Sequence, residues 1–322
     1  RYTQCLRKEM NEMNKKPNMI RPYPPKGKVD IILDTDTYNE IDDQFAVCYM
    51  MLSPEKFNVK GICAAPFFNE RSTGPCDGME KSYNELLKIF SLLGREKDTG
   101  LIHKGATKYL DDENTPVDCD ASHFIAETAE KYTPENPLYV AAIGAITNVA
   151  SALIEKPEIA DRVVVVWLGG HGRDFEHTKE FNLIQDVAAA RVVFSSGARV
   201  VQLPCMGVVS ELLITMPELE LYIKGKNALC DYLYENVREC NPESYKTRPW
   251  GRVIWDVSAI AWFFGGEMNM MSSRFDRVLL PSYSGIYENN IDCGFLEYVY
   301  KLRRDEIFNH LFKKLTAFKI DG

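Results

Sequence analysis

A short apolar run that ends in a cluster of acids, KVDIILDTDTYNEIDDQFA at residues 28–46, constrains the fold more than any other stretch. Residues 29–33 are rich in β-branched side chains, which predicts a strand buried on both faces of a parallel sheet. Apolar residues then recur with helical spacing from Phe45 to Met50, ahead of Pro54. The acids therefore lie where a strand passes into a helix, which is the edge where α/β sheets bind ligands.

Five carboxylates belong to this junction: Asp34, Asp36, Glu40, Asp42 and Asp43. Crowded carboxylates repel one another and are costly to bury unpaired, so they require either protonation or a cation. Because no Cys or His lies among them, the oxygen ligands indicate a hard ion, Ca²⁺ or Mg²⁺, rather than zinc. The alternative is an acidic, solvated loop that also caps the helix, since acids are favoured near a helix N-terminus.

Strands and helices alternate along the chain, which predicts a parallel sheet covered by helices. After the first strand, we expect strands at 57–65, 101–105, 137–143, 162–168 and 199–203. Helices are expected at 79–93, 122–132, 146–155 and 186–196, and, in a mostly helical later half, at 227–237, 257–264 and 304–316. The predicted fold class is α/β, with a mostly parallel open sheet, helices on both faces and a helical C-terminal portion.

One large domain is predicted for residues 29–322, because no Gly/Ser-rich linker or shift in composition interrupts them. Residues 1–28 are basic and end in a proline-rich segment, which predicts an N-terminal extension packed on the domain or on a partner subunit. The net charge of −8 argues against nucleic acid as the main partner, and no apolar run is long enough to cross a membrane. Nine scattered cysteines without a CxxC pair favour a reduced, cytoplasmic protein.

Several common catalytic fingerprints are missing from the sequence. Neither GxGxxG nor GxxxxGK[ST] occurs, which argues against the usual phosphate-binding loops. No GxSxG is present either, which argues against the simplest serine hydrolase.

Two further groups of residues bear on function. Glu180, Phe181 and Asn182 form a polar pair around an aromatic residue, an arrangement that suits recognition of sugar hydroxyls. Trp255 and Asp256 open the helix predicted at 257–264. Taken alone, an Asp at a helix start is usually a cap and a Trp beside it is usually part of the core.

Taken together, these residues resemble the calcium-dependent nucleoside hydrolases, the inosine-uridine and purine nucleoside N-ribohydrolases. That family opens with D-x-D followed shortly by D-D, and this chain has Asp34, Asp36, Asp42 and Asp43. Further matches follow in the family's order: GAITN at 144–148, Gly169 and Gly170, EFN at 180–182, DVAAARVVFSSG at 186–197, and Asp256. The likeness covers roughly residues 29–264, and the ordered set is far more specific than any single motif.

The resemblance implies a metal site and a catalytic base. Asp36, Asp43, Asp256 and the backbone carbonyl of Ile143 would hold Ca²⁺, with Asp34 supporting them. Asp36 would also accept a proton from the metal-bound water that attacks C1′ of the ribose, because a cation lowers the pKa of its water.

The resemblance also implies how the ribonucleoside substrate is held. The residues implied to bind ribose hydroxyls are Asp42, Asn69, Glu180 and Asn182, with Asn39 as a further candidate. Fixing these hydroxyls would let positive charge develop on the sugar ring as the bond to the base breaks. Family likeness further implies a homo-oligomer, a dimer or a tetramer.

Three positions depart from the family pattern. Tyr38 replaces a Gly, so either the loop follows another path or Tyr38 covers the site. Residues 171–179 lack the usual Gly-Asn pair, which leaves Asp174 and His177 as candidates for the 5′-hydroxyl contact. Trp255 stands where many members have the His that protonates the departing base. This is similar to the purine-preferring branch, in which aromatic rings stack on the base, so we expect purine ribonucleosides ahead of pyrimidine ribonucleosides.

Two alternatives to hydrolysis of ribonucleosides remain open at this point. Residues 34–37, DTDT, come close to the D-x-D-x-T opening of haloacid dehalogenase-class phosphatases, although the final Thr falls one position early. A non-catalytic nucleoside or sugar binder is the second alternative, suggested by Tyr38 and by the missing His.

Overall fold

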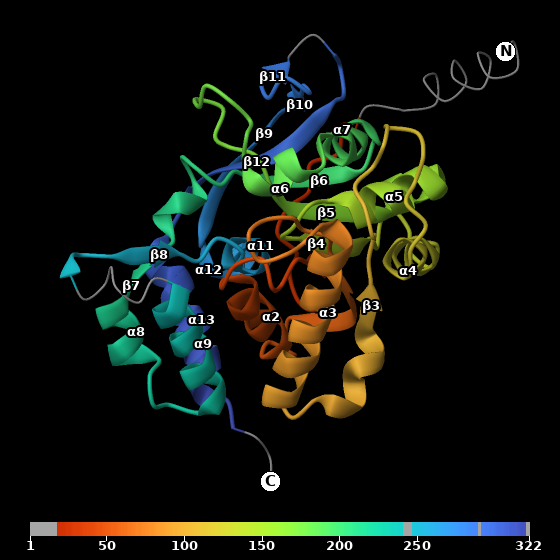
Figure 1. The fold of residues 1–322 in the computed structure, drawn as a ribbon. Coiled ribbons are helices and arrows are strands. Elements are labelled where there is room, and N and C mark those ends of the chain that lie inside the picture. Colours follow the sequence, from red (N-terminus) through yellow and green to blue (C-terminus); the bar gives the residue numbers. More distant parts are fainter. Residues whose placement is uncertain (1–17, 241–246, 289–290, 320–322) are drawn as a thin grey trace, which may run out of the picture.

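The computed structural model describes residues 18–240, 247–288 and 291–319. Most of the predicted N-terminal extension, residues 1–17, and Cys5 with it, lies outside the described residues. An eight-stranded sheet in the order β3-β2-β1-β4-β5-β6-β12-β9 forms the centre of the molecule (Figure 1). Its strands are β1 (Val29–Thr35), β2 (Phe57–Ala64), β3 (Ile102–Lys104), β4 (Leu138–Ala142), β5 (Val163–Leu168), β6 (Arg199–Leu203), β9 (Met271–Arg277) and β12 (Phe295–Leu302).

The sheet is parallel except at one edge, where β9 runs antiparallel to β12. From β1 the chain proceeds outward through β2 and β3, then returns to place β4, β5 and β6 on the other side. After β1 the chain continues to β2 on one side, and after β4 it continues to β5 on the other side. The connections from these two neighbouring strands therefore lead away in opposite directions. Such a switch point opens a crevice at the carboxyl ends of the strands, where α/β proteins bind ligands.

Helices cover both faces of the sheet, as predicted. They are α2 (Asp43–Met51), α3 (Pro75–Leu92), α4 (Asp120–Ala129), α5 (Thr147–Glu155), α6 (Phe181–Gln185), α7 (Val187–Ser195), α8 (Met216–Tyr222), α9 (Ala228–Cys240), α11 (Val257–Trp262), α12 (Gly265–Met268) and α13 (Arg304–Ala317). In Figure 1, α4, α5 and α7 lie on the opposite side of the central strands from α2, α9 and α13.

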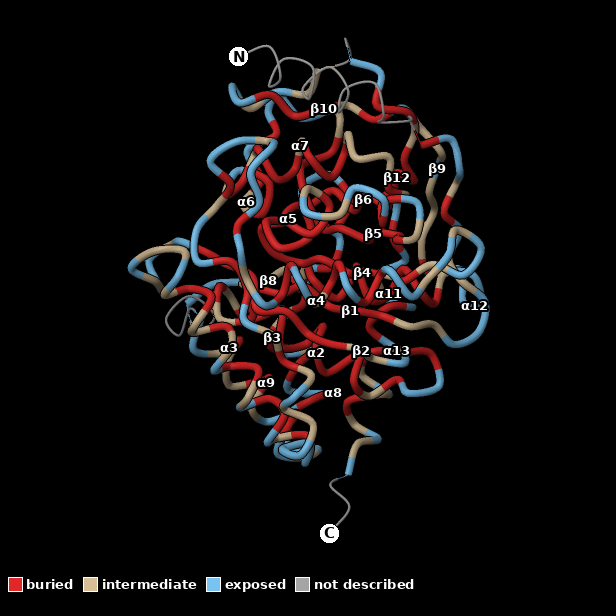
Figure 2. The backbone as a smooth tube through the Cα atoms, turned by 90° about the vertical axis from the view of Figure 1, so that its right-hand side faces the viewer, coloured by how far each residue is buried: buried red, intermediate tan, exposed pale blue. Residues whose placement is uncertain are grey.

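Alternating side chains of β1 pack in two separate hydrophobic cores, one on each face of the sheet. Ile31 and Leu33 pack in the core under α2, α11 and α13, whereas Ile32 packs in the core under α4, α5 and α7. All three are fully buried, which explains why the run reads as continuously apolar. Figure 2 shows this buried interior as a band of red tube, with exposed segments around it.

The predicted fold class is confirmed, and the C-terminal portion adds strands that the sequence analysis missed. Besides its helices, this portion supplies β9 and β12 to the main sheet. It also supplies β8 (Gly251–Val253), which pairs with β7 (Leu213–Thr215) in a two-stranded sheet. A second two-stranded sheet consists of β10 (Leu280–Pro281) and β11 (Tyr287–Glu288). β9 is a mostly half-buried edge strand with few apolar residues, so no apolar run marks it.

Helix α3 begins at Pro75, one turn before the predicted start at Met79. Gly78, just before the predicted start, lies inside the helix, where a Cβ would come 2.0 Å from the carbonyl oxygen of Phe67. Gly78 is therefore required by close packing rather than by a turn. Among the described residues, no helix is both long and apolar enough to span a membrane.

Candidate functional site

The strand-to-helix junction buries its acids at the switch point. Asp36 follows β1 directly, and Asp42 and Asp43 mark the start of α2. These three residues are between 1% and 3% exposed. Asp34, within β1, accepts a 2.7 Å hydrogen bond at Oδ1 from Nδ2 of Asn148, while its Oδ2 has no partner. The junction is therefore not a solvated acidic loop.

Asp36 is the least satisfied of these acids, since neither carboxylate oxygen has a hydrogen-bond partner. It lies against Gly144, just beyond β4, where a Cβ would come 3.0 Å from Cγ of Asp36. Burial raises the pKa of Asp36 well above its usual value, and the charges of Asp43 and Asp42 raise it further. A buried carboxyl with two bare oxygens needs a proton or a cation.

Asp256, at the start of α11, joins this group from far along the chain. Oxygens of Asp42, Asp43 and Asp256 lie within 4.8 Å of one another, so these three acids can hold a metal ion. Oδ1 of Asp43 also accepts a 2.5 Å hydrogen bond from the Thr35 hydroxyl. Burial raises the pKa of Asp256, and the surrounding Asp carboxylates add to the shift. A donor set of carboxylate oxygens suits a hard cation.

A cavity of about 230 Å³ opens beside these acids. It is lined by seven of the predicted site residues, namely Asn39, Asp42, Ile143, Glu180, Asn182, Trp255 and Asp256. Asp36 and Asp43 are not part of this lining, although both are buried beside Asp42 and Asp256. Asn69 also lies outside the lining and donates a 2.6 Å hydrogen bond from Nδ2 to Oδ1 of Asn39.

Backbone ends of β4 and β5 form the floor of the cavity. Nδ2 of Asn182 donates to the carbonyl oxygens of Ile143, at 3.1 Å, and Leu168, at 3.0 Å. Glu180 caps the helix α6 and accepts backbone hydrogen bonds from Gly170, Asn182 and Leu183, each at 2.9 Å. These contacts hold the two EFN side chains beside the acids.

Trp255 lies half-buried in the cavity wall next to Asp42. Its backbone N–H donates to Oδ2 of Asp42 at 2.9 Å. Arg252 pairs with Glu40, another residue of the cavity wall. Tyr38 does not line this cavity; it lines a neighbouring cavity of about 680 Å³ that shares Asn39 and Glu40.

The sequence analysis missed part of the cavity wall. Further lining residues are Leu168, whose carbonyl accepts a hydrogen bond from Asn182, and His171, Lys179, Phe181, Cys205 and Met206. Only 9% of His171 is exposed. The candidates for the 5′-hydroxyl contact, Asp174 and His177, are both exposed and do not line the cavity. The sequence analysis matched Gly169 and Gly170 to the family pattern and gave His171 no role, although a His soon after the predicted strand at 162–168 was an available signal.

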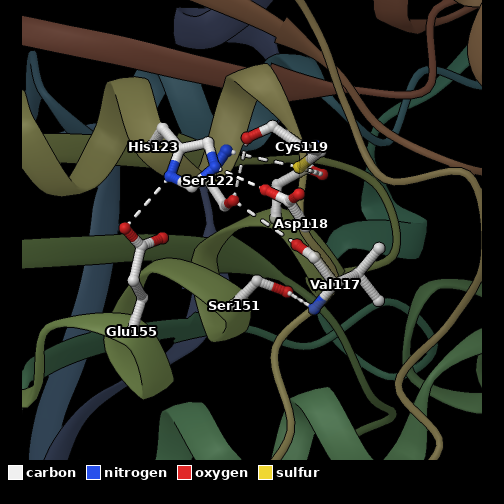
Figure 3. A network of polar contacts seen from close by, with 8 residues as sticks. Val117, Asp118, Cys119, Ser122, His123, Ser151 and Glu155 are labelled. Carbon is white, nitrogen blue, oxygen red and sulfur yellow. Dashed lines mark hydrogen bonds and ion pairs between the residues drawn. The ribbon is translucent and has the colours of Figure 1, made fainter.

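A second group of titratable residues, around His123 on α4, has a different character (Figure 3). Nε2 of His123 lies 2.5 Å from Asp118 and Nδ1 lies 3.0 Å from Glu155, so both ring nitrogens have carboxylate partners. These hydrogen bonds raise the pKa of the His123 imidazole. Because both nitrogens donate in the charged form, this exposed group ties α4 to α5 and offers no ligand to a metal.

Comparisons with known proteins agree with this geometry. The family model described as inosine-uridine preferring nucleoside hydrolase matches residues 31–276. A non-specific ribonucleoside hydrolase, RihC, of Salmonella paratyphi B is 27% identical over 262 residues, covering 77% of this chain and 83% of the relative. The pyrimidine-specific ribonucleoside hydrolase RihA of Escherichia coli O1:K1 is 26% identical, covering 74% and 80%.

Solved structures show the same fold. The plant nucleoside hydrolase PpNRh1 superimposes with a TM-score of 0.70 at 18% identity, covering 90% of this chain and 99% of that one. The purine-preferring ribonucleoside hydrolase from Gardnerella vaginalis gives a TM-score of 0.69 at 20% identity, covering 89% and 98%.

Proposed function

The chain belongs to the inosine-uridine preferring nucleoside hydrolase family and therefore hydrolyses ribonucleosides, and we propose that purine ribonucleosides are its preferred substrates. The observation that carries the proposal is the bare, buried carboxylate of Asp36 beside a cavity whose wall includes Trp255. Family membership replaces the phosphatase hypothesis. The relatives named above differ from one another in specificity, so the proposed purine preference rests on Trp255.

We further propose that Ca²⁺ is held by Asp36, Asp43, Asp256 and the carbonyl oxygen of Ile143. Two observations support this assignment: the unpartnered oxygens of Asp36 and the closeness of Asp43 to Asp256. When bound, Ca²⁺ supplies a Lewis acid that lowers the pKa of a water molecule in its shell.

Asp36 acts as the general base in this proposal. One of its unpartnered oxygens takes a proton from the attacking water, whose oxygen forms a bond to C1′ of the ribose. The N-glycosidic bond breaks and its electron pair leaves with the base, which takes up a proton from solvent while Asp36 returns its own proton to solvent. The products are ribose and the free base. Asp34, hydrogen-bonded to Asn148, supports the adjacent backbone.

The ribose hydroxyls are bound by Asn39, Asp42, Glu180 and Asn182, all of which line the cavity. Asn69 acts through its 2.6 Å hydrogen bond to Asn39, which orients that side chain. Holding the hydroxyls fixes the sugar in the geometry in which its ring can carry positive charge.

Trp255 provides the surface for the base. The indole cannot protonate a leaving base, but it can stack on it, and base–aromatic stacking contributes about 1–3 kcal/mol. A purine offers two fused rings to such a surface, whereas a pyrimidine offers one. This difference is the physical reason for placing purine ribonucleosides first.

Ribose release tests the proposal directly. The protein is incubated with inosine, guanosine, adenosine and uridine, with Ca²⁺ or with a chelator, and free ribose is measured. We expect turnover with Ca²⁺, faster for the three purine ribonucleosides, and none with the chelator. Trp255→Ala should lower kcat/KM for inosine more than for uridine. Tight binding of a ribonucleoside without turnover, with Ca²⁺ bound, would instead identify a non-catalytic binder.

Two lesser proposals concern assembly and compartment. We propose a homo-oligomer, either a dimer or a tetramer, on the family resemblance, and light scattering measures its mass. We also propose a cytoplasmic location, on the scattered cysteines of the sequence and their lack of a CxxC pair.

A further inference from the structure

We propose that Glu40 is a specificity-determining residue: its carboxylate accepts a hydrogen bond from the N1–H group of a 6-oxopurine, so that inosine and guanosine are preferred to adenosine. The assignment rests on the proposed function, which places ribose beside the acids and the base on Trp255. Glu40 and Trp255 line the same cavity. No role has been given to Glu40 so far beyond its ion pair with Arg252.

Glu40 is the acid of the cavity wall whose carboxylate has the fewest commitments. The acids that line the cavity are Glu40, Asp42, Glu180 and Asp256. Glu180 accepts three backbone hydrogen bonds, and Asp42 and Asp256 belong to the group that can hold a metal ion. Within the described part of the chain, the Glu40 carboxylate accepts a hydrogen bond from Arg252 alone, at Oε2. Oε1 is therefore the oxygen that remains for a ligand.

Two arginines hold Glu40 from outside the substrate cavity. Arg252, on β8, pairs with Oε2, and Nη1 of Arg71 donates to the backbone carbonyl of Glu40 at 2.8 Å. Both arginines line the neighbouring cavity of about 680 Å³ and neither lines the substrate cavity, whereas Glu40 lines both. The Glu40 side chain is 38% exposed, so its carboxylate is accessible. Held in this way, Glu40 is preorganised, which lowers the entropy lost on binding.

The contacts around Trp255 place Glu40 along the cavity wall. Residues 40–43 meet residues 252–256 in the same order along both segments. The paired residues are Glu40 with Arg252, Asp42 with Trp255, and Asp43 with Asp256. The backbone contact of Trp255 therefore lies between the Glu40 ion pair and the carboxylates proposed to bind the metal.

The shape of a purine ribonucleoside fits this order. C1′ lies at the metal end, where the water attacks, and it is bonded to N9 of the base. N1 and C6 belong to the six-membered ring, on the side of the base remote from N9. A base that stacks on Trp255, with C1′ toward the metal, therefore directs this edge toward Glu40.

The chemistry of this edge makes Glu40 selective. In inosine and guanosine N1 carries a proton, which a carboxylate accepts in a charge-assisted hydrogen bond. In adenosine N1 presents a lone pair, which a carboxylate repels. A site built to bind an N–H group rejects an analogue that lacks it, because its polar group then loses its partner.

Three substrates test the assignment by comparison. Inosine has the N1 proton, adenosine lacks it, and purine ribonucleoside lacks both that proton and any 6-substituent. We measure kcat/KM for each with Ca²⁺, for the wild type and for Glu40→Gln, which keeps the size of the side chain but removes its charge. We expect kcat/KM for inosine to fall by about 5- to 10-fold, and that for the other two to change by less than about twofold.

Other results would overturn the assignment. Equal losses on all three substrates would mean that Glu40 binds ribose or only supports the wall. Equal losses on inosine and adenosine, with none on purine ribonucleoside, would place the contact at the 6-substituent instead of N1. No loss on any substrate would mean that Glu40 does not contact the base.

Two further variants complete the experiment. Glu70→Gln is the matched control, because Glu70 is exposed and lines only the neighbouring cavity, and it should leave all three values unchanged. Glu40→Asp keeps the charge on a shorter side chain and replaces Glu40→Gln should the latter not fold; it should also lower kcat/KM for inosine more than for the other two. Absence of wild-type turnover of all three substrates, with Ca²⁺ bound, would overturn the proposed function itself, whereas equal losses in an active enzyme overturn only the role of Glu40.

Discussion

Two sets of buried carboxylates differ in what their oxygens contact. The acid cluster, which we define as Asp36, Asp42, Asp43 and Asp256, contains the two bare oxygens of Asp36. The capping acids, which we define as Glu180 and Asp186, are equally buried but accept several hydrogen bonds each. Asp186 binds the backbone N–H groups of Leu110 and Ala189 and the hydroxyl of Thr147.

This difference in hydrogen bonding separates the proposed metal ligands from the acids that cap helices. Hydrogen bonds from fixed donors compensate the capping acids for the loss of water, so these acids hold loops and helix ends in place. The acid cluster has too few donors for its charges, and mutual repulsion adds to the cost of burial. Burial alone therefore does not mark a proposed metal ligand or base, whereas burial with oxygens left without hydrogen bonds marks Asp36 as a candidate.

The largest expected effect is on activity at the acid cluster. Asp36→Asn removes the proposed base while keeping its shape, so we expect kcat to fall by about 10³-fold, measured as ribose release at saturating inosine. The free energy of unfolding of the metal-free protein should rise, because a buried repulsive charge is removed. Asp305→Asn, at a 91% exposed side chain, is the control and should change neither quantity. Unchanged kcat in Asp36→Asn would remove Asp36 from the mechanism.

The second prediction concerns the capping acids. Asp186→Ala leaves three buried donors without their acceptor, which we expect to lower the free energy of unfolding by about 3 kcal/mol in urea titrations. Asp186→Asn retains an acceptor and should lose less. A variant as stable as the wild type would mean that these hydrogen bonds do not stabilise the fold, and the comparison would fail.

The third prediction is that Ca²⁺ distinguishes the two sets. At a free concentration 100 times Kd, Ca²⁺ should raise the free energy of unfolding by about 2.7 kcal/mol, seen as a higher Tm. Asp256→Asn should abolish most of this increase, whereas Asp186→Asn should preserve it. An equal response to Ca²⁺ in both variants would show that the ion binds elsewhere.

The smallest effect is the share of the pH dependence of stability that Asp34 adds to that of the acid cluster, because Asp34 is only half satisfied. Burial raises the pKa of Asp34 from 3.8 to about 7, so the folded state binds its proton more tightly than the unfolded state does. Its contribution to stability is present below about pH 4 and is lost as the pH rises through about 7, with a slope of at most about 1.4 kcal/mol per pH unit. Urea titrations of the metal-free protein measure this slope. Asp34→Asn should flatten it, and an unchanged slope would assign the proton to another group.

Much of the fold could be predicted because its strands are continuous apolar runs. Residues 31–33 and 163–168 are buried on both faces of the sheet, so sequence pattern and burial agree there. β9 could not be predicted in this way, because an edge strand with intermediate burial has no such pattern. Its place is determined by pairing with β12, a contact between segments that no local pattern reports.

The part of the candidate site that could be predicted consists of residues that lie close together in the sequence. Asp36, Asp42 and Asp43 lie within one junction, and their density of charge already indicated a cation. That Asp256 reaches them followed from the family resemblance, and the geometry now agrees. His171 was missed as a cavity residue because its place in the lining depends on the path of the backbone after β5 rather than on its neighbours in sequence.

The late position of Asp256 in the chain has a consequence for synthesis. A ribosome completes β1 to β6 and the first three acids of the cluster well before it reaches this residue. A nascent polypeptide that stops short of α11 therefore lacks one of the proposed metal ligands. If the proposed assignment holds, activity waits until α11 has been synthesised and has packed beside α2.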